Sequence, residues 1–352
     1  DAWLDHEIRF MVRGNEIAAV TAVKNGSVVY RNIWLSEVKD GVFKAYMGAA
    51  SREFKAEGKL AEEAKKTEGR LAPNLADLYV EHGRLSRVTV KKERIHGKIL
   101  SVTEDTVEIE GYGTIPLDEN FYVYKLFGEF SVLGAADILV GYDLQEFVAA
   151  DGKLCAALLE RPFDARTIRV LLMDTGFKNL FHKKAELELN CDARLVCKND
   201  DGDSKESTLK KGEVLTLTAE DERLKHGRMT IIPEKEEGIT IRSLERAQGQ
   251  PVYSGSLEIK KEEEGLVLIN ELYLEDYLKK VVPSEMPASY EKEALKTQAV
   301  CARTYAYRQI QGNTYGAYGA HVDDSTSFQV YNNTQTNERT DQVVDETYGQ
   351  LL

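Results

Sequence analysis

The chain has 352 residues, of which 30% are charged and 42% hydrophobic, and its formal net charge is −13. This length allows two or three domains with real cores. The acidic balance argues against a dominant nucleic-acid surface, because phosphate binding needs clustered Lys and Arg. No apolar run reaches the roughly 18 residues of a membrane helix. Because the chain starts at Asp1 and not at Met, an export signal or anchor can precede it, and we expect membrane attachment only through an anchor absent from this chain.

Residues 1–160 are predicted to be mainly β and to form an accessory domain, a small barrel or sandwich. Turn signals at Asn25-Gly26 and Asp151-Gly152 separate predicted strands. Lys55–Arg70 is highly charged and is expected to be an exposed helix or a mobile loop. Nothing in this half indicates catalysis. The predicted strands cover residues 10–12, 18–23, 27–30, 97–102, 106–110 and 147–159.

A second β segment begins near Thr167 and opens the domain expected over residues 161–352. Residues 252–259 and 266–269 flank a charged tip and predict a hairpin. The acidic loop at residues 199–203 resembles a calcium loop loosely, but it lacks the closing Glu and is expected to be a solvated loop. The other predicted strands cover residues 168–173, 186–189, 194–197, 215–218 and 229–232.

The four cysteines, Cys155, Cys191, Cys197 and Cys301, form no CxxC pair and have no His at zinc-finger spacing. We expect ordinary buried or half-buried thiols, by the general tendency of cysteine to be interior. A disulfide between Cys191 and Cys197 across a hairpin is the alternative.

The pattern becomes helical at Glu271. A short helix is expected to end before Pro283, since the residue before a proline disfavours the α region. A longer helix follows, with Ser289 as N-cap and acidic residues in its first turn. Its narrow apolar stripe consists of Leu295, Ala299, Ala302 and Ala306.

Glu285 lies between these helices, in the stretch VVPSEMP. The two prolines predict a rigid turn, since each fixes φ and removes a donor. The positive end of the following helix dipole would favour the carboxylate, whereas desolvation by Met286 would favour the acid. On residue types alone, Glu285 is a surface carboxylate in a proline-rich turn or a functional group.

Two further polar sets follow. Lys296 and Arg303 share one helix face, with Gln298 on an adjacent face, and they are either a solvated stripe or one wall of a groove. Residues 321–331 mix acids, hydroxyls, an amide and an aromatic ring, as sugar-binding proteins do. A polar loop running into an edge strand would have the same composition.

Ordered motifs in the last hundred residues are similar to those of the SpoIID/LytB family, named for stage II sporulation protein D and the amidase enhancer LytB. They are YSGSLEI, LYLEDYL, VVPSEMP, EALKTQAVCARTY, DSTSFQVY and DETYGQLL. They span residues 251–352, and residues 168–172 resemble the strand that opens the family's N-terminal part. The resemblance does not cover the first 160 residues. Together with the strand pattern of the first half, it implies an α+β fold, with a β-rich accessory domain before a mixed domain whose central helix follows VVPSEMP.

The resemblance implies a lytic transglycosylase that acts on peptidoglycan glycan strands, typically ones stripped of stem peptides in the sporulation branch. The family's essential acid falls on Glu285, which would protonate the bond between MurNAc and GlcNAc and then deprotonate the sugar's C6 hydroxyl, closing a 1,6-anhydro ring. Candidate groove residues in the matching motifs are Lys296, Gln298, Arg303, Asp324, Thr326, Gln329 and Tyr331. The family also suggests an extracytoplasmic, often membrane-anchored protein of engulfment, with a cell-wall amidase as a partner.

Two departures qualify the resemblance. Family domains continue past the DETYGQLL-like element, so the domain is expected to be incomplete at Leu352. Some members bind zinc, but His321 and Cys301 alone do not make a structural zinc site, and we predict no metal and no cofactor. One alternative is a non-catalytic module that binds peptidoglycan or enhances an amidase. Another is a hydrolase that pairs Glu285 with Asp323 or Asp324.

Overall fold

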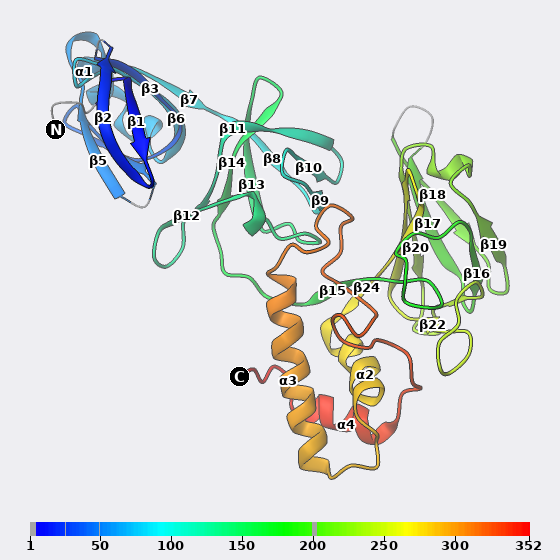
Figure 1. Ribbon diagram of the computed structural model, residues 1–352. Helices are drawn as coiled ribbons and strands as arrows, with labels where there is room; N and C mark the ends of the chain where they lie inside the picture. The colour runs from blue at the N-terminus through cyan, green and yellow to red at the C-terminus, as the bar shows by residue number, and fades with distance from the viewer. Residues whose placement is uncertain (1–4, 25, 49, 199–202) are drawn as a thin grey trace. The chain divides into compact units, whose positions relative to one another are not determined.

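A computed structural model describes residues 5–24, 26–48, 50–198 and 203–352 (Figure 1). The chain divides into two compact units, both rich in strands. The described residues also contain four α-helices, which confirms the predicted α+β class. Whether the units are the functional domains predicted at 1–160 and 161–352 stays a prediction. The first unit comprises Asp1–Lys98, Glu104–Ile138 and Tyr142–Pro162, and the second comprises Ile99–Thr103, Leu139–Gly141 and Phe163–Leu352.

In the first unit, one antiparallel sheet has the strand order β5-β4-β3-β6-β7. Helix α1 (Gly58–Leu71) packs against β3, which confirms the helical alternative for Lys55–Arg70. Its Ala64 joins Phe43, Phe54 and Leu78 in a buried cluster. Strands β1 and β2 form a separate ribbon. The strands are β1 (Ile8–Arg13), β2 (Glu16–Val23), β3 (Ser27–Lys39), β4 (Val42–Met47), β5 (Ala50–Lys55), β6 (Asn74–Glu81) and β7 (Arg84–Lys91).

A second sheet of this unit places β8, β13, β14, β11 and β10 side by side, and β12 pairs with β11. Strands β13 and β14 form the hairpin predicted around Asp151-Gly152. Asn25 of the other predicted turn lies outside the described residues, and the narrower choice of barrel or sandwich stays a prediction. The strands are β8 (Glu93–His96), β10 (Thr106–Ile109), β11 (Gly113–Lys125), β12 (Ser131–Leu133), β13 (Gln145–Ala150) and β14 (Lys153–Leu159).

The second unit contains a sheet of order β18-β17-β20-β23-β24-β15-β25 and a smaller one of order β19-β16-β21-β22. Strands β23 and β24 form the predicted hairpin, with Glu263 and Glu264 at its tip. Residues 199–202 of the predicted acidic loop lie outside the described residues. The strands are β9 (Ile99–Val102), β15 (Thr167–Leu171), β16 (Ala185–Leu189), β17 (Ala193–Lys198), β18 (Ser204–Leu209), β19 (Val214–Leu217), β20 (Arg228–Pro233), β21 (Ile239–Ile241), β22 (Val252–Tyr253), β23 (Ser256–Glu262), β24 (Gly265–Tyr273) and β25 (Val322–Asp323).

Three helices, α2 (Leu274–Glu285), α3 (Lys292–Ile310) and α4 (Glu338–Glu346), pack against one another (Figure 1). The predicted stop before Pro283 is wrong, because α2 continues through the proline. Burial of Val281, Val282 and Pro283 outweighs the local preference of the residue before a proline. The predicted N-cap at Ser289 is also wrong, since Glu291 occupies that position. The predicted stripe is confirmed, because all four of its side chains are buried.

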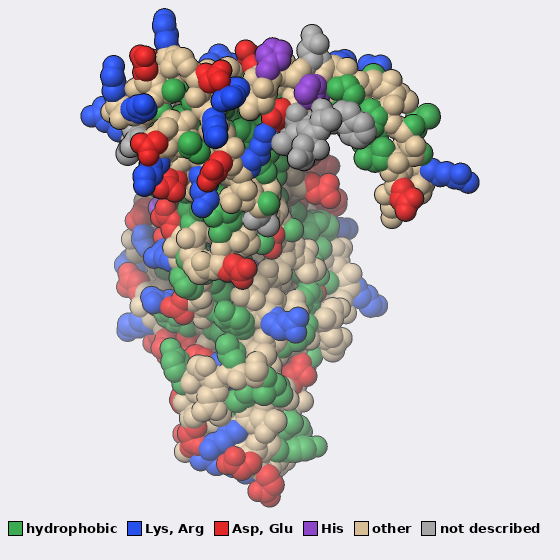
Figure 2. All heavy atoms as spheres, turned by 90° about the vertical axis from the view of Figure 1, so that its left-hand side faces the viewer, with side chains coloured by type: hydrophobic (Ala, Val, Ile, Leu, Met, Phe, Trp, Pro, Cys, Tyr) green, Lys and Arg blue, Asp and Glu red, His purple; other side chains and the backbone are tan. Residues whose placement is uncertain are grey.

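Three further features of the molecule are its surface charges, its four cysteines and the hydropathy of its helices. On the face shown in Figure 2, basic and acidic side chains are interspersed. Cys155 and Cys191 are buried and Cys197 is half-buried, as predicted, but the prediction is wrong for Cys301, which is exposed. All four are free thiols, so the alternative disulfide does not form. No helix in the described ranges is long and apolar enough to span a membrane.

A buried arginine joins the central strands of the second unit. Arg169 on β15 is 1% exposed and pairs with Glu258 on β23 and Glu271 on β24. Its Nε donates to the carbonyl of Gly319. Nearby, Gly255 has a φ of +76° and approaches so closely that a Cβ there would lie 2.3 Å from the carbonyl oxygen of Glu271. The glycine of the YSGSLEI motif is therefore required by the backbone.

Replacing Arg169 with Met should lower the free energy of unfolding by about 3–5 kcal/mol, because two carboxylates would lose their buried partner. Chemical denaturation measures this loss. Arg166→Met is the matched control, since Arg166 makes an exposed ion pair with Asp164 and its loss should change stability little. Equal stability of the two variants would contradict the role of Arg169.

Candidate active site

Glu285 is the last residue of α2 and its side chain is exposed. The predicted place in a turn at the positive end of the next helix dipole is therefore wrong. The carboxylate lies at the C-terminal end of a helix, where the dipole does not stabilise negative charge. The backbone N–H of Val330 donates to Oε1 of Glu285 at 2.6 Å and fixes the carboxylate instead.

Ser284 attaches the end of α2 to the same segment. Its hydroxyl donates to the carbonyl of Lys280 at 2.7 Å and accepts from the N–H groups of Asn333 and Thr334 at 3.2 and 3.1 Å. Two consecutive residues of VVPSEMP thus hold residues 330–334 against the helix. These hydrogen bonds restrain the stretch in addition to its prolines.

Aromatic packing supports this junction from the core. Tyr331 and Tyr277 are fully buried and stack with ring centroids 5.0 Å apart. The Tyr331 hydroxyl donates to Asn270 at 2.7 Å, and the Tyr277 hydroxyl donates to Gln329 at 3.3 Å. The backbone around Val330 is therefore held in place on both sides of the residue that binds Glu285.

Both acids proposed as second catalytic groups are buried and already bonded. Asp324 accepts from Arg246 at 2.6 Å and from the N–H of Met173 at 2.8 Å. Asp323 accepts from the Tyr315 hydroxyl and from the N–H of Ser325, each at 2.8 Å. Burial raises the pKa of Asp324 to about 6, although the Arg246 charge acts in the opposite direction.

Two tyrosines of α2 and α3 have raised pKa values. Burial raises the pKa of Tyr277 well above its usual value, and the negative charges of Glu285 and Asp323 raise it further. Burial and the charge of Asp323 also raise the pKa of Tyr305, a half-buried residue of α3. Of these two tyrosines, Tyr277 is fully buried and Tyr305 is partly accessible.

The remaining candidates fall into an accessible and a buried set. Thr326 is exposed, and Gln298 and Lys296 are half-buried. Lys296 binds Glu346 of α4 at 2.9 Å, and both residues line a pocket of about 380 Å³. No described contact joins Lys296, Gln298 or Thr326 to Glu285, so their predicted role in substrate binding stays a prediction.

Arg303 belongs to the buried set. It is 1% exposed, and its Nε and Nη2 each donate to Glu275 at 2.8 Å. Its guanidinium also donates to the carbonyls of Val344 and Gln350 and so joins α2, α3 and the region of α4.

Four residues that were predicted to contact the substrate are buried in the core, so this prediction is wrong for them. Arg303, Asp324, Gln329 and Tyr331 support the site from the core and do not line an open groove. No site role was predicted for Ser284, Tyr277 or Tyr305. The proximity of Ser284 to Glu285 in VVPSEMP was the one available signal.

The hydrogen bonds of His321 are structural. His321 is buried, its Nδ1 accepts from the N–H of Arg169 at 3.0 Å, and its Nε2 lies 2.9 Å from the carbonyl of Val140. Within the described ranges, no group of three His, Cys, Asp or Glu side chains is arranged to hold a metal ion.

Comparison with known proteins bears on the same region. The SpoIID family, described as Stage II sporulation protein, matches residues 262–352. The chain carries a SpoIID-family domain. The match includes α2, Glu285 and the segment that binds it. No solved structure matches the chain significantly.

Curated relatives match short stretches. An uncharacterised protein of Brachyspira hyodysenteriae is 39% identical over 33% of this chain and 30% of its own. The amidase enhancer of Bacillus subtilis is 44% identical over 21% of this chain and 10% of its own. Stage II sporulation protein D of Bacillus subtilis is 45% identical over 18% of this chain and 19% of its own. The chain thus covers less than a third of each of these relatives.

Replacing Arg303 with Met should destabilise the fold by about 3 kcal/mol, because Glu275 would lose its partner in a mostly buried pair. Chemical denaturation measures the change. Lys296→Met removes the same charge from an accessible position of α3 and should have little effect. If Arg303→Met left stability unchanged but weakened glycan binding, the core position assigned to Arg303 would be wrong.

Proposed function

We propose that the SpoIID-family domain is a peptidoglycan lytic transglycosylase, with Glu285 as acid and then base. The observation that carries this proposal is the exposed carboxylate fixed by the Val330 N–H in the family-matched region. Relatives named for sporulation and for amidase enhancement support a cell-wall role. The substrate is glycan, expected to be stripped of stem peptides, and the place of action is outside the cytoplasm.

The chemistry requires one carboxyl group. As an acid, Glu285 protonates the glycosidic oxygen between MurNAc and GlcNAc, and the bond to C1 of MurNAc breaks as positive charge develops there. The C6 hydroxyl of the same MurNAc attacks C1, and its proton passes to the Glu285 carboxylate. The products are a free GlcNAc end and a 1,6-anhydro-MurNAc end. The proton returns to Glu285 and no water is consumed.

The bonding of the neighbouring acids favours this route over hydrolysis with two carboxylates. A hydrolase needs a second carboxylate to act as nucleophile or to activate water. Asp324 is 0% exposed and bound to Arg246, and Asp323 is 2% exposed and bound to Tyr315. Neither presents a free oxygen to a sugar at the surface. Tyr305 offers a partly accessible ring for stacking on the glycan.

A second function has its own support. The 44% identity to a protein named amidase enhancer favours a domain that binds peptidoglycan and stimulates an amidase without cleaving glycan. This alternative predicts amidase stimulation by the wild type and by a Glu285 variant alike, with no anhydro product from either.

Glu285→Gln should reduce the release of anhydro ends from denuded sacculi by at least about a hundredfold, because amide cannot donate or accept the required proton. Mass spectrometry of the digested glycan measures these ends. The matched control is Glu291→Gln, which neutralises another exposed carboxylate just before α3 and should leave the rate unchanged.

Retention of glycan binding by Glu285→Gln would separate loss of chemistry from loss of fold. Product formation at the wild-type rate by this variant, or reducing MurNAc ends from the wild type, would contradict the assignment.

A further inference from the structure

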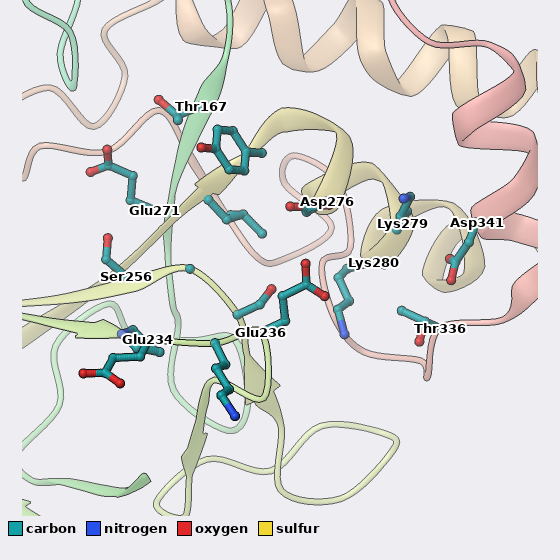
Figure 3. A pocket seen from close by; sticks show the side chains of 16 residues that line it. Thr167, Glu234, Glu236, Ser256, Glu271, Asp276, Lys279, Lys280, Thr336 and Asp341 are labelled. Atoms are coloured by element: carbon teal, nitrogen blue, oxygen red, sulfur yellow. The ribbon is translucent and has the colours of Figure 1, made fainter. Parts of the chain in front are cut away.

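A polar pocket of about 660 Å³ lies beside α2 in the second unit (Figure 3). It is lined by α2, α4, the loop after β20, the start of β23 and the end of β24. Glu285 is not among its lining residues. The volume falls within the roughly 300–1,000 Å³ of small-molecule sites.

Two opposite charges on α2 face this pocket without pairing. Asp276 and Lys280 are four residues apart, a spacing that brings Cβ atoms to roughly 5–6 Å and commonly gives an ion pair. Both are half-buried, and among the described residues neither side chain has a hydrogen bond or a salt bridge. The adjacent Lys279, by contrast, binds Asp345 at 2.9 Å.

A third charge comes from the loop after β20. Figure 3 shows Glu236 beside Asp276 and Lys280. Burial raises the pKa of Asp276 and the negative charge of Glu236 acts in the same direction, whereas the positive charge of Lys279 lowers it. Burial lowers the pKa of Lys280, and the negative charges of Asp341 and Asp276 act in the opposite direction. Both charges are thus partly desolvated without a direct partner, which is the state that a ligand of complementary charge relieves.

Asp341 of α4 adds an acceptor at the edge of the pocket. Its Oδ1 is buried and has no hydrogen-bond partner in the part of the chain that the structure describes. A buried polar atom without a partner carries a desolvation cost that a donor would remove. Hydroxyl groups of Ser256 and Thr336 also line the pocket and suit a polar ligand.

We propose that this pocket binds a free polar α-amino acid, with its ammonium group between Asp276 and Glu236 and its carboxylate on Lys280. An α-amino acid carries the two charges on one carbon, which matches charges one helical turn apart. The remaining volume receives the side chain, with Asp341 and the hydroxyl groups as partners. This site is distinct from Glu285 and does not depend on the proposed glycan chemistry.

Glutamine is a suitable probe, because it has a polar side chain without further charge. The full chain should bind glutamine at millimolar concentration in saturation-transfer NMR. N-acetylglutamine lacks the ammonium group and glutaminamide lacks the carboxylate, so each should bind at least about tenfold more weakly, as expected for the loss of a charged hydrogen bond. Equal binding of the three compounds, or no binding of glutamine, would overturn the proposal.

Substitutions test whether Lys280 and Glu236 bind the amino acid. Lys280→Met should weaken glutamine binding at least about tenfold while leaving the weak binding of glutaminamide unchanged. Lys279→Met is the charge-matched control and should change binding less than about twofold, because its ammonium already binds Asp345. Glu236→Gln, at an exposed loop position, tests the ammonium contact even if the Lys280 variant does not fold. Wild-type glutamine affinity in Glu236→Gln and in a folded Lys280→Met would rule the site out.

Discussion

The hydrogen bonds between the end of α2 and residues 330–334 are the constraint on which the candidate active site depends. Glu285 and Ser284 accept three backbone N–H groups of that segment, and the segment has no regular secondary structure to satisfy these donors itself. Backbone groups that lack a partner are costly, so the side chains of the motif and the fold of the segment require each other. The carboxylate proposed for catalysis is thereby held by the backbone that shapes its surroundings.

The core beneath this junction explains why several polar side chains of the motifs are buried. Tyr331 stacks on Tyr277, Asp324 binds Arg246, and Arg303 binds Glu275. Each of these pairs ties a segment of the site to an element distant in sequence. Their burial keeps the junction rigid and leaves Glu285 as the accessible acid among those proposed for catalysis.

Features set by local periodicity could be predicted from the sequence. The apolar stripe of α3 and the β23–β24 hairpin follow from spacings of a few residues. The extension of α2 through Pro283 could not, because burial of that proline against the rest of the unit overrides its local preference. The partner of Arg303 is 28 residues away, and no periodic pattern indicates that distance. Glu285 could be singled out because its motif is distinctive, whereas the burial of Tyr331 and Asp324 depends on the whole core.

Helix α2 contributes to both of the proposed sites. Its end presents Glu285, and its side presents Asp276 and Lys280 to the 660 Å³ pocket. The carbonyl of Lys280 accepts the Ser284 hydroxyl, so one turn of helix is common to both.

The origin of the oxygen atoms in the cleaved glycan distinguishes transglycosylation by Glu285 from hydrolysis. When denuded strands are digested in water labelled with heavy oxygen, we expect anhydro-MurNAc ends without label. Reducing MurNAc ends that carry the label would contradict it, because a water molecule would then have replaced the sugar's own hydroxyl.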